Sequence, residues 1–227
     1  MELRPILSTL LRHKTAATLI VLEIALTCAI ICNALFMIGQ RITQVRMPSG
    51  LAEKELVRIQ ITGIGNDPNE VAQTRSDLAM LRGLPGVAAA TVVNQVPYGN
   101  SSWNSGINLD PAQERPTANA TVYMADEQFV DTFGVRIVAG RGFLPDEYID
   151  FSAFNQPDSE ATVPAALITR ALAERLFPGE DPLGKVFYSW GDAPTRVIGV
   201  IEHLVRPNAV GGPEQREYAM VFPIRVP

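Results

Sequence analysis

The sequence predicts one membrane-spanning helix near the N-terminus, followed by an extracytoplasmic domain of the α+β class. Three observations lead to this prediction. An apolar run of about 23 residues is long enough to cross a bilayer. The remainder of the chain alternates strand-like and helix-like patterns, which indicates strand-helix-strand units. With 227 residues in all, the chain is long enough to bury a hydrophobic core beyond the membrane helix.

The apolar run covers residues 16–38. A helix of this length reaches roughly 34 Å, against a hydrocarbon core of about 30 Å. Its apolar residues cover every face, unlike the single stripe of a soluble helix, and no signal-peptide cleavage site follows it. We therefore expect a cytoplasmic segment at 1–15, a transmembrane helix at 16–40 and a domain at 41–227.

Basic residues on either side of the span predict its orientation. Arg4, Arg12 and Lys14 precede it, whereas Arg41 and Arg46 follow it. The positive-inside rule then places the N-terminus in the cytoplasm, by three basic residues against two. The domain after the helix is therefore expected outside the cytoplasm.

Glu23 is the candidate functional residue of the span. An ionisable group at that depth costs on the order of 3 kcal/mol on insertion scales, so it is expected either to contact a neighbouring helix or to serve transport. Both alternatives require other membrane helices nearby. Cys28 and Cys32 are expected to be packing residues. The domain has no cysteine and therefore no internal disulfide.

The first predicted unit of the domain is strand, helix, strand. Residues 56–64 alternate apolar and polar side chains, with Val57, Ile59 and Ile61 on one face, and a second strand is expected at 87–96. The helix between them is expected to start at the N-cap Asp67, with Pro68 at the first helical position, and to end near Gly83. Its inward residues are expected to be Val71, Leu78 and Leu81.

Residues 97–116 are rich in Asn, Ser, Gly and Pro, which predicts a long surface loop. Trp103 within it is expected either to anchor this loop or, less often for such residues, to contact a partner. After the loop, Asp126 is suited to cap a short helix with Phe129 and Phe133 facing the core. Gly134 is suited to end that helix, and a strand is expected at 135–138.

Two glycines, Gly140 and Gly142, flank Arg141. They allow a tight turn that aims the guanidinium at a fixed acceptor, for which Asp146 and Glu147 are the nearby candidates. We expect a structural ion pair here; the alternative is that Arg141 binds a substrate.

Further along the chain, a strand ending at Ile168 is expected to lead into a helix that begins near Thr169 and buries Leu172 and Leu176. Two more buried strands are expected, one from Arg196 and one in the sequence YAMVFP near the end.

The residues Gly179-x-x-x-x-Gly184-Lys185 match the first part of a phosphate-binding loop. Val186 stands where such a loop needs Ser or Thr to hold magnesium, and Pro182 removes an amide donor. Two acidic residues inside the loop would also repel phosphate. We therefore expect no nucleotide site.

The remaining composition gives no sign of catalysis. The two histidines, His13 and His203, have neither a metal-binding spacing nor a neighbouring nucleophile. Acidic residues outnumber basic ones by 24 to 19, which disfavours nucleic acid as a partner. The sequence predicts a protein that is not an enzyme and needs no cofactor or metal.

Four segments, in this order, resemble the permease subunits of MacB-like and FtsX-like ABC transporters: LRHKTAATLIVLEIALT, FGVRIVAGRGF, ALITRALAERLFPGEDPLGKVF and RVIGVIEHL. The resemblance spans nearly the whole chain. It implies a MacB-like periplasmic core domain held at the bacterial inner membrane. It also implies an architectural role for the motif residues Gly134, Gly140, Arg141, Phe143, Pro182, Gly184 and Lys185.

The resemblance further implies a function in which ATP hydrolysis by a separate cytoplasmic ABC ATPase subunit moves the periplasmic domain for export or envelope signalling. Its partners would be that ATPase, a second permease chain in a homo- or heterodimer, and in some systems a periplasmic adaptor protein. Because the chain stops at Pro227 without further spans, we expect a fragment, a truncation or one part of a split protein, with a domain incomplete at its C-terminus. The alternative is a single-span, membrane-anchored periplasmic sensor or binding module.

Overall fold

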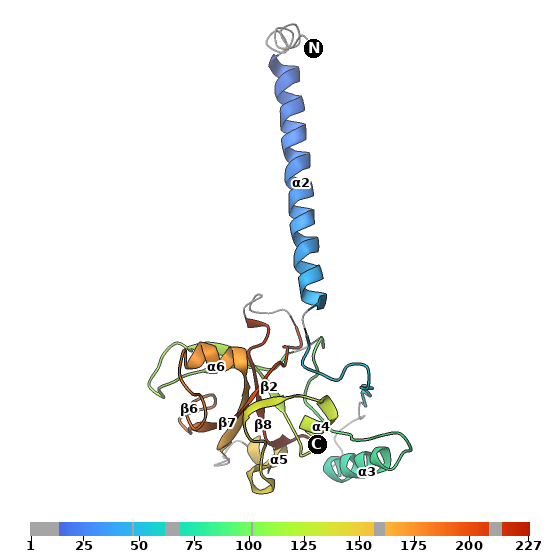
Figure 1. Cartoon of the computed structure of the whole chain (residues 1–227), viewed down its shortest axis with the longest axis vertical. Coiled ribbons are helices and arrows are strands. Elements are labelled where there is room, and N and C mark those ends of the chain that lie inside the picture. The colour runs from blue at the N-terminus through green and yellow to red at the C-terminus, as the bar shows by residue number, and fades with distance from the viewer. Residues whose placement is uncertain (1–13, 47, 62–68, 101, 157–161, 209–214) are drawn as a thin grey trace. The chain divides into compact units, whose positions relative to one another are not determined.

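The computed structural model describes residues 14–46, 48–61, 69–100, 102–156, 162–208 and 215–227. The chain divides into two compact units, Met1–Met47 and Pro48–Pro227. The described part of the first unit is one helix, and the second is a mixed α/β domain (Figure 1). This architecture confirms the predicted fold class.

Helix α2 (Lys14–Arg46) includes the whole predicted span 16–40. Its stretch Lys14–Thr43 is long and apolar enough to cross a membrane, and none of the apolar window is buried against the rest of the chain. The helix is continuous because it contains no proline, and its only glycine, Gly39, lies near its end.

The domain is built on a seven-stranded mixed sheet with the strand order β1-β2-β8-β5-β7-β3 and β6 paired to β7. The pairs β2–β8 and β5–β7 are parallel, and the remaining pairs of this sheet are antiparallel. A second, two-stranded parallel sheet joins β4 to β9. The strands are β1 (Asn104–Ile107), β2 (Ala118–Met124), β3 (Ile137–Gly140), β4 (Ile149–Asp150), β5 (Ala165–Thr169), β6 (Val186–Phe187), β7 (Thr195–Ile201), β8 (Ala219–Phe222) and β9 (Ile224–Arg225).

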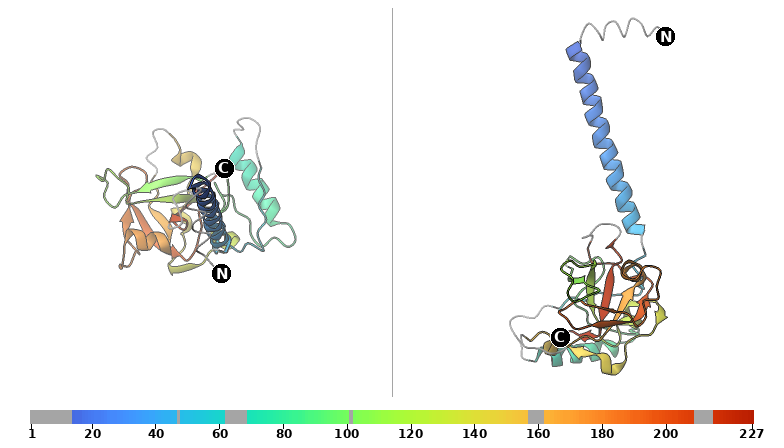
Figure 2. Two further views of the ribbon diagram at one scale, coloured as in Figure 1. Left: turned by 90° about the horizontal axis from the view of Figure 1, so that it is seen from above. Right: turned by 90° about the vertical axis from the view of Figure 1, so that its left-hand side faces the viewer.

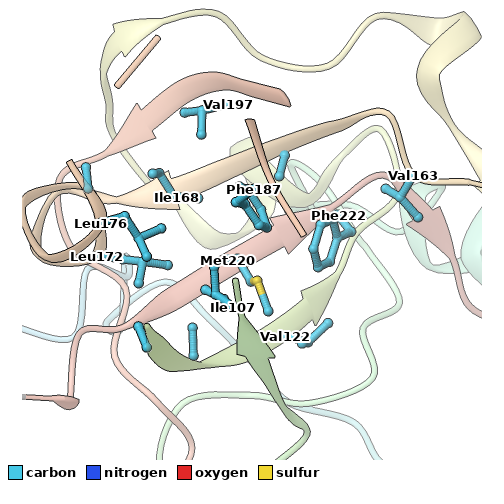
Figure 3. Packing of buried hydrophobic residues seen from close by; sticks show 14 of the residues in the cluster. Ile107, Val122, Val163, Ile168, Leu172, Leu176, Phe187, Val197, Met220 and Phe222 are labelled. Atoms are coloured by element: carbon cyan, nitrogen blue, oxygen red, sulfur yellow. The ribbon is translucent and has the colours of Figure 1, made fainter. Parts of the chain in front are cut away.

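Both faces of the large sheet are buried. Consecutive residues of β5 point to opposite faces, so Ile168 joins one apolar cluster and Leu167 the other. Helix α6 (Arg170–Leu176) contributes buried Leu172 and Leu176 to the first cluster (Figure 3). Helix α4 (Phe129–Phe133) contributes both its phenylalanines to the second cluster. The predicted core residues of these two helices are confirmed.

The cap of the short helix α4 lies two residues later than expected. Asp126 is not at the N-cap position, which Gln128 occupies. The Asp126 carboxylate instead accepts a hydrogen bond from the Gln128 backbone N–H at 3.0 Å, in the turn before the helix. Gly134 ends the helix in the left-handed conformation with φ +68°, as predicted. The strand expected at 135–138 runs two residues later, as β3.

The strand predicted at 56–64 is wrong for its described part, residues 56–61, which form no strand. Val57, Ile59 and Ile61 are exposed by 86%, 59% and 70%. Alternating apolar residues predict that an extended segment has one apolar face, but a strand also needs a neighbouring strand to pair with its backbone hydrogen-bonding groups. Residues 56–61 find no such neighbour among the described residues; residues 62–64 lie outside them.

The strand predicted at 87–96 is also wrong. This segment contacts β2 through hydrogen bonds from its side chains, and its backbone does not pair with β2 as a strand. The Asn94 amide donates to Val122 O at 2.9 Å and accepts from Met124 N–H at 2.9 Å. Gln95 donates to Val122 O at 2.7 Å. These contacts occupy the part of β2 beyond the end of its partner β1.

Helix α3 (Glu70–Arg82) is confirmed, and it ends at Gly83 as expected. It lies at the periphery of the domain (Figure 2). None of its residues is fully buried, so the expected inward residues Val71, Leu78 and Leu81 are only half-buried. The predicted N-terminal residues Asp67 and Pro68 lie outside the described residues.

The segment predicted as one long loop, 97–116, contains strand β1, so this expectation is corrected in part. Its polar residues obscure the strand, which pairs with β2. Trp103 is half exposed; its backbone N–H donates to Gln95 at 2.8 Å, and its ring lies 6.3 Å from that of Phe151. Two short helices complete the domain, η1 (Pro145–Glu147) and α5 (Phe151–Phe154).

Candidate functional site: an anchored entry segment, two turns on β7 and a charged cleft

The chain enters the domain through residues 48–52, which we call the entry segment. Gly50 has φ +83°, and a Cβ atom there would lie 1.8 Å from the His203 carbonyl oxygen. Only glycine therefore allows this approach. Ser49 is 3% exposed, and its carbonyl accepts a hydrogen bond from Val205 N–H at 3.2 Å. The entry segment is thus fixed to the chain that follows β7.

A second contact fixes the entry segment to the end of α4. The Ala52 N–H donates to the Phe133 carbonyl at 2.9 Å. At the neighbouring Gly134, a Cβ atom would lie 2.8 Å from the Ala52 side chain. The family-motif residue Gly134 therefore makes room for the entry segment as well as ending the helix. Sequence reasoning missed Ser49 and Gly50, for which the short Pro-Ser-Gly sequence is the only signal.

The first motif turn, residues 140–143, is attached to β7. Gly140 has φ +74°, and a Cβ atom there would lie 2.2 Å from the Ile198 carbonyl. That carbonyl accepts a hydrogen bond from the Arg141 N–H at 3.0 Å. The ring of Phe143 packs edge-on against Tyr148, with centroids 5.7 Å apart. Because Gly140 has no Cβ, the backbone at the end of β3 can approach the backbone of β7 this closely.

Arg141 forms the expected ion pair, and its partner is Glu147. The guanidinium donates from Nη1 to Oε2 at 2.8 Å and from Nη2 to Oε1 at 2.7 Å. Glu147 also accepts from the Leu144 N–H at 2.7 Å. The hydrogen bonds from Arg141 hold the pKa of Glu147 below its ordinary value, and the same bonds raise the pKa of Arg141. Glu147 thus closes the turn and binds the guanidinium of Arg141 in a bidentate pair.

The second motif turn, residues 181–185, is attached to the same strand. Gly184 has φ +78°, and its N–H donates to the Val197 carbonyl at 2.8 Å. The Lys185 ammonium pairs with Glu180 and lies 5.3 Å from the Phe177 ring centroid. Lys185 therefore contacts the residues just before its turn.

The two motif turns also meet each other across β7. The Leu183 side chain, which follows Pro182, lies 2.8 Å from where a Cβ of Gly140 would stand. Gly199 in β7 is equally confined, because its Cβ would lie 2.5 Å from the Arg141 carbonyl. The structure therefore joins both motifs into one tight joint, with β7 at its centre. Glu23, the remaining candidate, belongs to the other unit.

A cleft of about 250 Å³ lies between α3 and the small sheet, and sequence reasoning did not predict it. Arg82 pairs with Asp126 at 3.3 Å, and Arg75 with Asp150 at 3.9 Å. Arg225 donates to Glu127 at 2.9 Å. Positive and negative groups alternate in its lining, so the cleft carries no surplus of one charge.

Burial and charge pairing set the proton equilibria beside this cleft. Burial raises the pKa of Tyr148 to about 12, and the carboxylates of Glu127 and Asp126 add to the rise. Burial is the largest single influence on the pKa of Glu127 and acts to raise it, but the hydrogen bonds from Arg225 and from the Glu127 backbone, together with the charges of Arg225 and Arg82, hold that pKa below its ordinary value. Both groups thus stay in one protonation state at neutral pH, which suits a structural network better than proton transfer.

The described residues contain no cluster of three or more His, Cys, Asp or Glu side chains able to hold a metal ion. His203 contacts Glu217 at 3.1 Å; His13 lies outside the described residues. The glycine-dependent contacts around β7 and the entry segment join backbone segments of the domain to one another.

A family model described as a MacB-like periplasmic core domain matches residues 15–225. No curated protein shows a significant match to the chain. Solved structures with a similar fold include the extracellular domain of the noncanonic ABC-type transporter YknZ from Gram-positive bacteria, with 20% identity and a TM-score of 0.41. They also include the periplasmic region of MacB from Actinobacillus actinomycetemcomitans, with 20% identity and a TM-score of 0.40.

A domain of a putative permease protein from Porphyromonas gingivalis is also similar, with 24% identity and a TM-score of 0.38. These matches cover 65%, 66% and 64% of the present chain, respectively. The chain in turn spans 60%, 54% and 54% of those three solved chains.

Proposed function

Because the chain belongs to the family of MacB-like periplasmic core domains, we propose that it is a permease-type subunit, or part of one, of a MacB-like or FtsX-like ABC transporter. In this proposal α2 crosses the inner membrane with its N-terminus in the cytoplasm, and the domain lies in the periplasm. A separate cytoplasmic ATPase moves α2, and α2 passes the movement to the domain for export or envelope signalling. A periplasmic adaptor protein would then bind the domain.

The observation that carries this proposal is the way the membrane-length helix joins the domain. Helix α2 ends at Arg46 and the folded unit begins at Pro48, so one residue separates them. The entry segment, which begins at Pro48, is hydrogen-bonded to the chain after β7 and to the end of α4. In this proposal, a displacement that reaches Pro48 is carried to the sheet through these contacts.

The partner prediction is tested by purifying the tagged full chain from its native membranes under mild detergent. We expect an ABC ATPase subunit to co-purify in a fixed ratio, and alkaline carbonate to leave the chain in the membrane pellet. A chain that co-purifies with no ATPase would contradict the transporter proposal.

The coupling step has its own test, in which the tryptophan fluorescence of the complex is followed on adding ATP. Both tryptophans of the chain, Trp103 and Trp190, lie in the domain, so the signal of the chain reports on the domain. We expect Gly50→Ala, which displaces the entry segment, to reduce the ATP-dependent change while the ATPase stays bound. The matched control is Gly179→Ala, because Gly179 has a similar positive φ of +74° with no atom near its Cβ position.

The charged cleft favours a second candidate function, a membrane-anchored sensor or binding module without transport. Its volume of about 250 Å³ is enough for a small ligand that carries both charges. This candidate predicts ligand-dependent protection of α3 from hydrogen exchange in a chain that binds no ATPase.

A further inference from the structure

Arg206 is the one basic side chain that is buried in the described part of the domain, with 3% of its surface exposed. It follows Val205, whose N–H binds the entry segment, and its own N–H donates to the Arg216 carbonyl at 2.8 Å. Its guanidinium donates from Nη2 to the side-chain oxygens of Asn104 at 2.5 Å and Asn119 at 3.1 Å. Both partners are neutral, so neither balances the positive charge.

The other donor atoms of the Arg206 side chain have no acceptor. Nε and Nη1 are both shielded from solvent and make no hydrogen bond. Arg206 also takes part in none of the ion pairs formed by the described residues. Burial lowers the pKa of Arg206, and only Tyr123 acts in the opposite direction. Because an arginine stays protonated in proteins even so, the guanidinium keeps a charge that no described residue neutralises.

Asp126, the other buried charge among the described residues, shows the usual arrangement. Its carboxylate pairs with Arg82 at 3.3 Å and accepts hydrogen bonds from the Thr91 hydroxyl and the Gln128 N–H. Buried charges are costly unless they are paired in this way. The domain thus neutralises its buried carboxylate but not its buried guanidinium, which indicates that the missing anion comes from outside the described chain.

The guanidinium of Arg206 lies close beneath the surface, against one face of the strand pair β1–β2. Asn104 and Asn119, which bind its Nη2, are both exposed. Asn104 is opposite Thr121 and Asn119 is opposite Gly106, so the two asparagines share this face. Thr121 accepts a hydrogen bond from the Gln95 amide at 2.8 Å, which adds only neutral groups. A small anion that approaches from this face therefore meets hydrogen-bonding groups without a repelling charge among them.

We propose that Arg206 is the binding site of a small monocarboxylate, whose carboxylate accepts hydrogen bonds from Nη1. One guanidinium among neutral polar groups matches a single negative charge. A phosphate group carries about −1.5 to −2 charges at pH 7 and is typically bound by clusters of arginines. Hydrogen bonds between a guanidinium and a carboxylate are stronger than those between neutral groups, so the bound anion offsets the cost of burying Arg206. This site goes beyond the proposed function, because it does not depend on an ATPase.

Urea unfolding of the full chain in detergent, followed by tryptophan fluorescence, tests the proposal with acetate as the probe. Sodium acetate is compared with sodium chloride at equal ionic strength. We expect acetate to stabilise the parent chain in a saturable way. At about ten times its dissociation constant, acetate should lower the unfolding equilibrium constant about elevenfold relative to chloride. Sodium phosphate at the same ionic strength should have a smaller effect.

A carboxylate built into the chain supplies a second measurement. Asn119→Asp places a negative charge beside Nη2 with almost no change of shape. This variant should be more stable than the parent in chloride and should lose its response to acetate, because Arg206 is then already paired. Asn155→Asp is the matched control, since it adds the same charge at another exposed position, the C-cap of α5. It should respond to acetate as the parent does.

Removing the guanidinium gives the converse result. Arg206→Met should abolish the response to acetate. Arg175→Met is its control, because Arg175 is exposed and donates only to the Thr117 carbonyl, at 3.2 Å. That variant should keep the response. If Arg206→Met does not fold, the comparison of Asn119→Asp with Asn155→Asp decides alone.

Three results would overturn the proposal: no saturable effect of acetate on the parent chain, an equal effect in Arg206→Met, or stronger stabilisation by phosphate than by acetate. A parent that ignores acetate but is destabilised by Arg206→Met would show that the chain itself already supplies the anion. None of these measurements requires an ATPase. Failure of the carboxylate site would therefore leave the proposed transporter standing, and a chain without an ATPase partner would leave the site standing.

Discussion

At the scale of single residues, glycines with positive φ differ in what surrounds them. Gly140 and Gly184 have nearly the same φ, +74° and +78°. A Cβ on Gly140 would strike the backbone of β7, whereas a Cβ on Gly184 would meet nothing within 4 Å. The pair therefore separates the cost of backbone strain from the cost of a collision.

We predict that Gly140→Ala destabilises the domain by more than about 2 kcal/mol, because strain and collision add. Gly184→Ala should cost about 1 kcal/mol, from strain alone. The measurement is urea unfolding of the full chain in detergent, followed by tryptophan fluorescence. Equal losses in the two variants would show that the joint at β7 relaxes around a new side chain.

The ion pair of Arg141 and Glu147 predicts a pH dependence. The folded-state pKa of Glu147 is lowered, so its contribution to stability is present above the ordinary value of 4.5 and is lost as the pH falls through the lower folded value. Glu147→Gln should cost about 0.5–1 kcal/mol at pH 7, since the pair is partly exposed. The difference from the parent chain should shrink in unfolding curves recorded below pH 4.5, and Asp146→Asn serves as the neighbouring control.

At the scale of elements, Asn94 acts as a substitute for a missing strand neighbour of β2. Its amide satisfies one acceptor and one donor of β2, at Val122 and Met124. Removing it leaves the Met124 N–H without its partner in a partly buried place, whereas Val122 O keeps the hydrogen bond from Gln95. The loss costs about 1–3 kcal/mol.

Asn94→Ala should therefore destabilise the domain and speed hydrogen exchange at the Met124 N–H. Asn94→Asp should have a smaller effect on that N–H, because a carboxylate still accepts its hydrogen bond. Unchanged exchange at Met124 in the alanine variant would mean that water replaces the amide.

The longer helices were predictable from the sequence, whereas the strands expected at 56–64, for its described part, and at 87–96 do not form, and strand β1 was missed. Local signals set a helix, and those of α3, α4 and α6 were visible as apolar spacing and terminal glycines. A strand depends on a neighbouring strand that can be distant in the sequence. The alternation at 56–64 predicted an apolar face but could not show which strand, if any, would pair with it. The polar strand β1 was hidden for the opposite reason, because β2 supplies its hydrogen bonds.

The candidate site divides in the same way. The partner of Arg141 was predictable because Glu147 is six residues away in the chain. The pairing of Arg82 with Asp126 spans 44 residues, and the sequence alone gives no reason to join them. The entry segment was missed because its contacts lie with His203 and Phe133, far along the chain.

At the scale of the whole molecule, the division into two compact units predicts that the domain folds without its helix. A chain that starts at Pro48 should be soluble and should unfold in urea at the same midpoint as the full chain. Both apolar clusters consist of residues after that point. Loss of the cooperative transition in the shortened chain would show that α2 contributes to the stability of the domain.

The order in which the strands are synthesised leaves β2 without its neighbour β8 for part of the time on the ribosome. This strand lies between β2 and β5, yet the ribosome makes it last of the three. At about 5–20 residues per second, β2 would wait roughly 5–20 s for its neighbour, with its backbone edge open to other chains. A change that slows translation between residues 125 and 218 should therefore raise aggregation while leaving the folded protein untouched.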